Sequence, residues 1–288
     1  MTEVWTTRRI LEWIEGYLSE KGIDNPRLSA QWLVADALGC SRIDLYADID
    51  RPLSESEREV LRESTKRRGT GEPLQYITGT CDFRFLSYFI EPGVLIPRPE
   101  TEVLVSEALA ALPKDEEILA LDLCTGSGNI ACSLASENPL IHVFATDLSP
   151  EACALAQRNV DHLGLSEQVL VMQGDLGSPL PDDIYGKVGL VISNPPYIPS
   201  NVLSGLDAEV KDFEPSLALD GGPDGLEVFR RIVPFAHDAL RTGGLFACEL
   251  HEGCLDAAAE IAQKAGFTGV RIVEDLVQKP RVLIAQKS

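Results

Sequence analysis

The second half of the chain alternates apolar runs of strand length with longer segments of helical periodicity. Strands are predicted at 118–123, 141–146, 168–172, 188–193 and 244–250, and helices at 127–137, 150–162, 225–241 and 255–265. This alternation is typical of a doubly wound parallel sheet covered by helices. Two last runs, 270–274 and 282–285, predict an antiparallel pair at the sheet edge. The predicted fold class is therefore α/β and Rossmann-like.

The first part of the chain has a different pattern. Residues 1–73 are predicted to form a small helical domain, with Trp13 and Trp32 on its core faces. Ser54 and Glu57 have the spacing of a capping box at the start of one helix. We expect this domain to recognise a substrate or to serve as a packing module.

A change of period separates the two parts. Between residues 74 and 96, Phe83 and Phe85 alternate with other apolar residues, and Pro92-Gly93 marks a turn. This pattern predicts a β-hairpin linker. The predicted division is therefore a helical domain at 1–73, a hairpin linker at 74–96 and an α/β domain at 97–288.

A glycine-rich turn follows the first predicted strand of the α/β domain. It contains Gly126 and Gly128, which allow the backbone to approach a ligand closely before the next helix begins. The second strand ends at Asp147, 19 residues beyond Gly128, where a carboxylate can accept both hydroxyls of a ribose. The expected cofactor-binding segment is therefore Cys124, Thr125, Gly126, Ser127 and Gly128, together with Asp147. Asp147 could instead only cap the following helix.

Asp175 and Leu176 follow the third strand. Asp175 is placed to contact the amino group of an adenine, and Leu176 to cover the ring. An ordinary turn aspartate is an equally good interpretation.

Asn194, Pro195, Pro196 and Tyr197 follow the fourth strand and are the most informative stretch of the chain. The Asn194 side-chain oxygen and the Pro195 carbonyl can accept both hydrogens of a planar amino group. Neither proline has an N–H that competes. The aromatic ring is expected to pack on the flat substrate. With an adenosine cofactor, this pattern favours methylation of an amide or exocyclic amine nitrogen.

Composition limits the alternatives. The net charge is −20, and residues 76–288 carry 14 basic and 31 acidic side chains, net −17. Such a surface repels phosphate backbones, so we expect no nucleic-acid partner. Seven cysteines without a C-x-x-C pair predict reduced thiols and no metal site. The absence of a long apolar run or a signal-peptide pattern predicts a cytoplasmic protein that does not bind a membrane.

Several motifs together resemble one family, the protein-(glutamine-N5) methyltransferases that act on class I peptide chain release factors. They are Glu72–Gly79, Val94–Glu102, Asp122–Gly128, Asn194–Tyr197 and Phe213–Leu226. The Pro-Arg-Pro-Glu-Thr-Glu segment at 97–102 and the Glu-Pro-x-x-Ala-Leu segment at 214–219 are much more specific than Asn-Pro-Pro-Tyr alone.

The resemblance implies the cofactor S-adenosylmethionine and, as substrate, the Gln of a Gly-Gly-Gln loop in the release factor. It implies that Asn194 and Pro195 hold the Gln amide with Tyr197 beside it, and that Asn194 also lies near the transferred methyl. The family usually has Gly where this chain has Cys124, His251 and Gln278, and Tyr where it has Phe213. We expect a monomer by default.

Two other functions remain open on the sequence. An adenine-N6 nucleic-acid methyltransferase would use the same Asn-Pro-Pro-Tyr clamp, although the acidic charge opposes it. A non-catalytic S-adenosylmethionine-binding protein would keep the cofactor turn but transfer no methyl group. The glycine turn alone does not exclude NAD, but the Asn-Pro-Pro-Tyr motif makes a nicotinamide oxidoreductase the more distant alternative.

Overall fold

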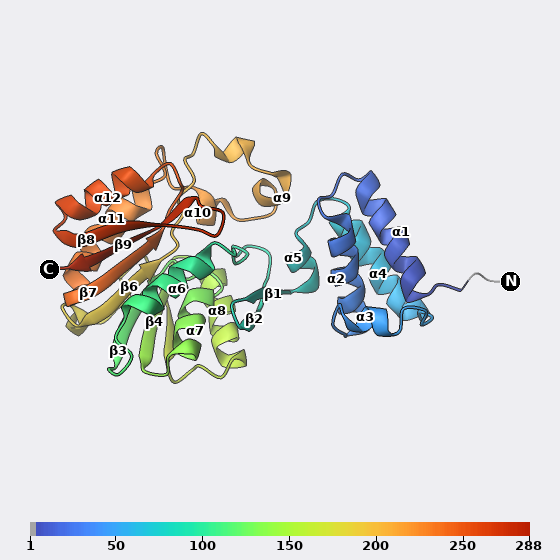
Figure 1. Ribbon diagram of the computed structural model, residues 1–288, viewed down its shortest axis with the longest axis horizontal. Coiled ribbons are helices and arrows are strands. Elements are labelled where there is room, and N and C mark those ends of the chain that lie inside the picture. Colours follow the sequence, from blue (N-terminus) through green and yellow to red (C-terminus); the bar gives the residue numbers. More distant parts are fainter. Residues whose placement is uncertain (1–3) are drawn as a thin grey trace. The chain divides into compact units, whose positions relative to one another are not determined.

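The computed structural model describes residues 4–288, and the chain forms two compact units. The first unit contains the residues up to Thr80 together with the later segment Asp207–Phe213. The second contains Cys81–Leu206 and Glu214–Ser288. Figure 1 shows the elements of both units along the chain.

The first unit is helical. Its elements are α1 (Thr7–Glu20), α2 (Pro26–Leu38), α3 (Asp44–Ala47), α4 (Glu55–Arg68), α5 (Leu74–Thr78) and α9 (Ala208–Lys211). Apolar side chains of α1, α2 and α4, such as Ile14, Leu33 and Leu61, form one buried core. The predicted capping box is confirmed, because the Ser54 side chain accepts from the Glu57 amide and the Glu57 side chain accepts from the Ser54 amide.

The prediction that Trp13 lies in the core is wrong. Its side chain is 46% exposed, stacked on Tyr17 with a ring separation of 5.6 Å. The buried stripe of α1 instead runs through Ile10, Ile14 and Leu18. Trp13 lies one position before Ile14 and is therefore rotated about 100° away from it around the helix.

The second unit is built on a seven-stranded sheet in the order β5-β4-β3-β6-β7-β9-β8. The strands are β3 (Ile118–Leu123), β4 (Ile141–Asp147), β5 (Val169–Gln173), β6 (Val188–Ser193), β7 (Leu240–Glu249), β8 (Phe267–Glu274) and β9 (Pro280–Lys287). The helices are α6 (Thr101–Ala111), α7 (Asn129–Glu137), α8 (Pro150–His162), α10 (Ser216–Leu219), α11 (Glu227–Ala239) and α12 (Leu255–Lys264). Strands β3 to β7 pair in parallel, and β9 is antiparallel to β7 and β8.

This topology confirms the predicted α/β fold. Helices α6, α7 and α8 pack beside one another, α11 packs on α12, and Figure 1 shows the two groups on opposite sides of the sheet. Every residue of the central strand β6 is buried, which explains its continuous apolar sequence. Strand β7 begins at Leu240, earlier than the predicted residue 244.

A β-hairpin precedes the sheet, made of β1 (Thr80–Phe83) and β2 (Leu86–Phe89). The prediction of a hairpin over 74–96 was too long at its start, because α5 occupies Leu74–Thr78. The segment Leu74–Thr78 forms a helix because its apolar residues Leu74 and Ile77 join the core of the first unit.

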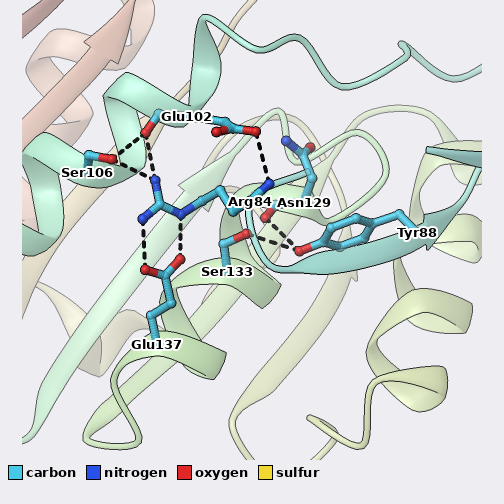
Figure 2. Close-up of polar contacts among 7 residues, drawn as sticks. All are labelled: Arg84, Tyr88, Glu102, Ser106, Asn129, Ser133 and Glu137. Carbon is cyan, nitrogen blue, oxygen red and sulfur yellow. Dashed lines mark hydrogen bonds and ion pairs between the residues drawn. The ribbon is translucent and has the colours of Figure 1, made fainter. Parts of the chain in front are cut away.

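The turn of the hairpin is fixed by Arg84, as Figure 2 shows. Its guanidinium forms a two-pronged ion pair with Glu137 of α7, in which Nη2 lies 2.7 Å from Oε2. It also donates to the Glu102 carbonyl at 2.8 Å and to Ser106 Oγ at 2.6 Å. One side chain therefore joins the hairpin turn to both α6 and α7.

Two further side chains join strand β2 to the start of α7. The Tyr88 hydroxyl contacts the Asn129 carbonyl and Ser133 Oγ (Figure 2). Asn159 of α8 accepts from the Phe89 amide at 2.8 Å and donates to the Ser127 carbonyl at 2.9 Å. The hairpin is thus connected to the glycine turn itself.

Across residues 4–288, each helix is too short or too polar to cross a lipid bilayer.

Candidate active site

A cavity of about 520 Å³ lies at the carboxyl ends of β3, β4, β5 and β6. Strand β3 is the first strand of the parallel sheet, and the chain winds from it to β4 on one side and later to β6 on the other. Ligands of open α/β sheets bind where the strand order reverses in this way. The cavity therefore occupies the expected ligand position.

The glycine turn forms one wall. Cys124, Gly126 and Gly128 all have positive φ, at 62°, 56° and 80°. Cys124 and Gly126 line the cavity, whereas Thr125, Ser127 and Gly128 are not on its wall. Gly128 is closely packed, because an added Cβ would lie 3.2 Å from that of Ala156.

Asp122 supports this turn from below. Its Oδ2 accepts from Thr125 Oγ1 at 2.6 Å and from the Ala131 amide at 3.2 Å. Its Oδ1 is buried and has no hydrogen-bond partner among residues 4–288. Burial raises the pKa of the Asp122 carboxyl to about 7, although the two hydrogen bonds oppose the rise.

Asp147 ends β4 and lies on the cavity wall. Its two carboxylate oxygens accept from the Gly126 and Ser149 amides, each at 2.9 Å. Each oxygen keeps a lone pair for a ligand hydroxyl. Burial raises the pKa of Asp147, and these amide bonds oppose the rise. Asp147 thus also stabilises the turn before α8.

Asp175 and Leu176 line the same cavity, beyond the end of β5. Leu176 has a φ of 50°, which is unusual for a side chain of its size. Asp175 Oδ2 forms an ion pair of 2.6 Å with Arg231 of α11. That partner was not foreseen and takes up part of the carboxylate.

The Asn-Pro-Pro-Tyr turn divides between the cavity and the interior. Asn194 and Pro196 line the cavity, and Pro195 is buried. Asn194 Nδ2 donates to Thr101 Oγ1 at 3.1 Å. Tyr197 is not on the cavity wall, and its hydroxyl donates to Glu249 Oε1 at 3.0 Å. Burial raises the pKa of Tyr197 well above its usual range.

Several cavity residues were missed by the site prediction. One wall comes from the segment around α10 together with Val228 of α11, and another from the segment after the hairpin. These residues are Gly93, Val94, Leu95, Pro215, Leu217, Ala218, Asp220 and Val228. All of them except Gly93 and Val228 belong to motifs quoted above for the family resemblance, so their sequence carried a signal without an assigned role.

At two positions where the family usually has glycine, this chain has another residue with a left-handed backbone. Cys124 and Gln278 both have a φ of 62°. Glycine adopts this conformation without strain, whereas other residues lose about 1–2 kcal/mol. The loops therefore keep a glycine-like conformation although both residues have side chains.

The cavity fits an adenosine cofactor by its chemistry. It offers a carboxylate at the end of the second parallel strand, an open glycine turn and an apolar surface from Leu176 and Val228. The unpartnered Asp122 Oδ1 adds a buried acceptor beneath the turn. Residues 4–288 contain no group of three or more His, Cys, Asp or Glu residues that could hold a metal ion.

Solved structures with the same fold are methyltransferases. One is a methyltransferase from Pyrococcus furiosus, with a TM-score of 0.51 and 20% identity over 70% of this chain and 88% of that chain. Another is the Thermus thermophilus 16S rRNA N2 G1207 methyltransferase in complex with AdoMet and guanosine. Its TM-score is 0.52, with 19% identity over 73% of this chain and 50% of that chain. Residues 100–204 also match the methyltransferase small domain family. The fold and this family match therefore define a methyltransferase of the Rossmann-like α/β class.

Sequence relatives identify the family. Residues 9–79 match the PrmC N-terminal domain. The release factor glutamine methyltransferase of Geobacter sulfurreducens is 43% identical over 95% of this chain and 94% of its own length. That of Rhodopirellula baltica is 37% identical over 99% and 97%. The chain belongs to the release factor glutamine methyltransferase family.

Proposed function

We propose that this enzyme transfers a methyl group from S-adenosylmethionine to the side-chain amide nitrogen of the Gln in the Gly-Gly-Gln loop of class I release factors. The observation that carries the proposal is the position of Asn194. It lies on the wall of the cofactor cavity at the end of β6, in a chain whose curated relatives are release factor glutamine methyltransferases.

In this proposal the cavity residues hold the cofactor through three contacts. Asp147 accepts the ribose hydroxyls, and Asp175 with Leu176 borders the adenine. Cys124 and Gly126, on the cavity side of the glycine turn, would hold the methionine part, and Asn194 would lie near the methyl group. When bound, S-adenosylmethionine supplies a methyl group on a positively charged sulfur, which makes it strongly electrophilic.

The Asn-Pro-Pro-Tyr turn activates the substrate. An amide nitrogen is a poor nucleophile because its lone pair is delocalised into the carbonyl. We infer that Asn194 Oδ1 and the Pro195 carbonyl accept the two N–H bonds, while Pro196 has no N–H to compete. These acceptors align the nitrogen and favour the positive charge that develops on it. One of its two N–H protons would then pass to water, which leaves a neutral N-methyl amide. Tyr197 contributes by packing beside the turn.

The test is transfer of labelled methyl to a purified release factor. We expect label on the normal factor and none on a factor with Gln→Ala in its Gly-Gly-Gln loop. Asn194→Ala should lower kcat by about a hundredfold, as for loss of one preorganised polar group, with cofactor binding intact. As a control, Asn138→Ala at the far end of α7 removes a similar side chain and should leave kcat unchanged. Equal labelling of the Gln→Ala factor would contradict the proposal.

The acidic charge of the second unit supports a protein substrate. We infer that the enzyme acts on protein rather than nucleic acid, because residues 76–288 carry a net charge of −17, from 14 basic and 31 acidic side chains. It would act as a cytoplasmic monomer, with the helical unit of residues 1–73 recognising the release factor. Light scattering with and without the factor measures the stoichiometry.

A further inference from the structure

A buried polar network lies behind Asn194 and is not explained by substrate contact. Asn194 Nδ2 donates to Thr101 Oγ1 at 3.1 Å. Burial raises the pKa of the Glu249 carboxyl, and a hydrogen bond from the Thr101 hydroxyl opposes the rise. Glu249 Oε1 accepts from the Tyr197 hydroxyl at 3.0 Å. The network joins the start of α6 to the ends of β6 and β7.

The members of this network are almost completely removed from solvent. Thr101 is 1% exposed and Glu249 is 0% exposed. Glu249 Oε2 has no hydrogen-bond partner among residues 4–288. A buried carboxyl that lacks a partner for one oxygen destabilises the folded state. An apolar residue at position 249 would avoid this cost, so a role in packing alone does not account for Glu249.

The hydrogen-bonding capacity of each group determines which atoms donate and which accept in this network. A carboxylate can only accept, and a threonine hydroxyl has one proton to donate. If Thr101 gives its proton to Glu249, its oxygen can only accept from Asn194. The Asn194 amide must then turn its NH2 group toward Thr101, which leaves its carbonyl oxygen on the other side.

We propose that Thr101 and Glu249 are positioning residues that hold the Asn194 amide with its oxygen, rather than its nitrogen, toward the substrate. This inference rests on the proposed function, since the substrate nitrogen also carries two hydrogens. If the Asn194 amide were rotated by 180°, its NH2 group would face another NH2 group, and no hydrogen bond could form. The network therefore selects the productive orientation before the substrate binds.

Thr101→Val tests the inference because it keeps the shape of the side chain and removes the hydroxyl. We expect kcat on a purified release factor to fall about tenfold, which corresponds to about 1.4 kcal/mol. The Kd for S-adenosylmethionine, measured by calorimetry, should change less than twofold. Thr101→Ser restores the hydroxyl and should recover most of kcat.

Glu249→Leu provides a second, independent variant. It removes the acceptor, so the Thr101 hydroxyl becomes free to donate to Asn194 and the amide can rotate. We expect a similar loss of kcat, together with a lower free energy of unfolding because the buried Tyr197 hydroxyl loses its acceptor. A merely structural role would lower stability in the same way but leave kcat of the folded enzyme unchanged.

Thr65→Val is the matched control, because Thr65 is 1% exposed and its hydroxyl has no partner among residues 4–288. It should leave kcat unchanged. Wild-type kcat in Thr101→Val, or failure of Thr101→Ser to recover kcat, would overturn the inference. If the wild-type enzyme itself labels no release factor, the proposed function fails instead, and the two failures are distinct.

Discussion

Replacement of Arg84 by alanine should destabilise the second unit by about 3 kcal/mol. The Arg84 side chain is 11% exposed and that of its partner Glu137 is 21% exposed, so the pair is largely removed from water. Removing one member of a buried ion pair costs about 3–5 kcal/mol, because the remaining charge is left without compensation. We expect the low end of this range, because Glu137 retains some contact with solvent.

A double-mutant cycle in urea unfolding measures this interaction. Glu137→Ala alone should cost less than Arg84→Ala, because the guanidinium keeps its bonds to the Glu102 carbonyl and Ser106 (Figure 2). The coupling energy between Arg84 and Glu137 should be about 1–2 kcal/mol. Lys264→Ala breaks an ion pair whose side chains are 76% and 69% exposed, and should cost less than about 0.5 kcal/mol.

Arg84→Ala should also weaken cofactor binding. The hairpin leads into Gly93, Val94 and Leu95, which line the cofactor cavity. Loosening the turn at Arg84 should therefore also weaken S-adenosylmethionine binding. A loss of stability for Arg84→Ala no larger than for Lys264→Ala would refute the reasoning, since it would mean that the buried pair contributes no more than an exposed one.

Three further predictions follow from single residues. Gln278→Gly should raise the free energy of unfolding by about 0.5–1 kcal/mol, because the side chain is exposed and φ is 62°; chemical denaturation checks this, and a decrease would contradict the strain argument. Because burial raises the pKa of Asp122 to about 7, the folded state binds its proton more tightly than the unfolded state does. Stability should therefore fall by about 3–4 kcal/mol between about pH 4 and pH 7. Asp122→Asn should flatten that slope in unfolding curves across this pH range, and an unchanged slope would exclude Asp122 as its source. Asp147→Ala should raise the Kd for S-adenosylmethionine at least tenfold by calorimetry, and an unchanged Kd would remove Asp147 from the site.

The α/β fold was predictable because its signals are local. The run from Val188 to Ile192 has no polar side chain. A strand that is buried on both faces requires such a continuous apolar sequence. The winding rules of parallel sheets then restrict the possible strand orders to a few. The position of Trp13 could not be predicted in the same way. Adjacent residues of a helix face different sides, and Trp13 is exposed although its neighbour Ile14 is buried.

The candidate site was predictable only in part. Asn194, Asp147 and Leu176 were expected near one ligand because they follow parallel strands, and all three line one cavity. Contacts between distant segments gave no local signal. Asn159 joins the hairpin to the glycine turn, but in the sequence it is only a polar residue in a helix. The bond between Tyr197 and Glu249 spans 52 positions, and the sequence suggested a different environment for the ring.

The most direct test of the central claim is tandem mass spectrometry of a release factor after incubation with the enzyme and S-adenosylmethionine. The account predicts one added methyl group on the side-chain nitrogen of the Gly-Gly-Gln glutamine, at a rate about a hundredfold lower with Asn194→Ala. A methyl group on another residue, or an unchanged rate with Asn194→Ala, would contradict it.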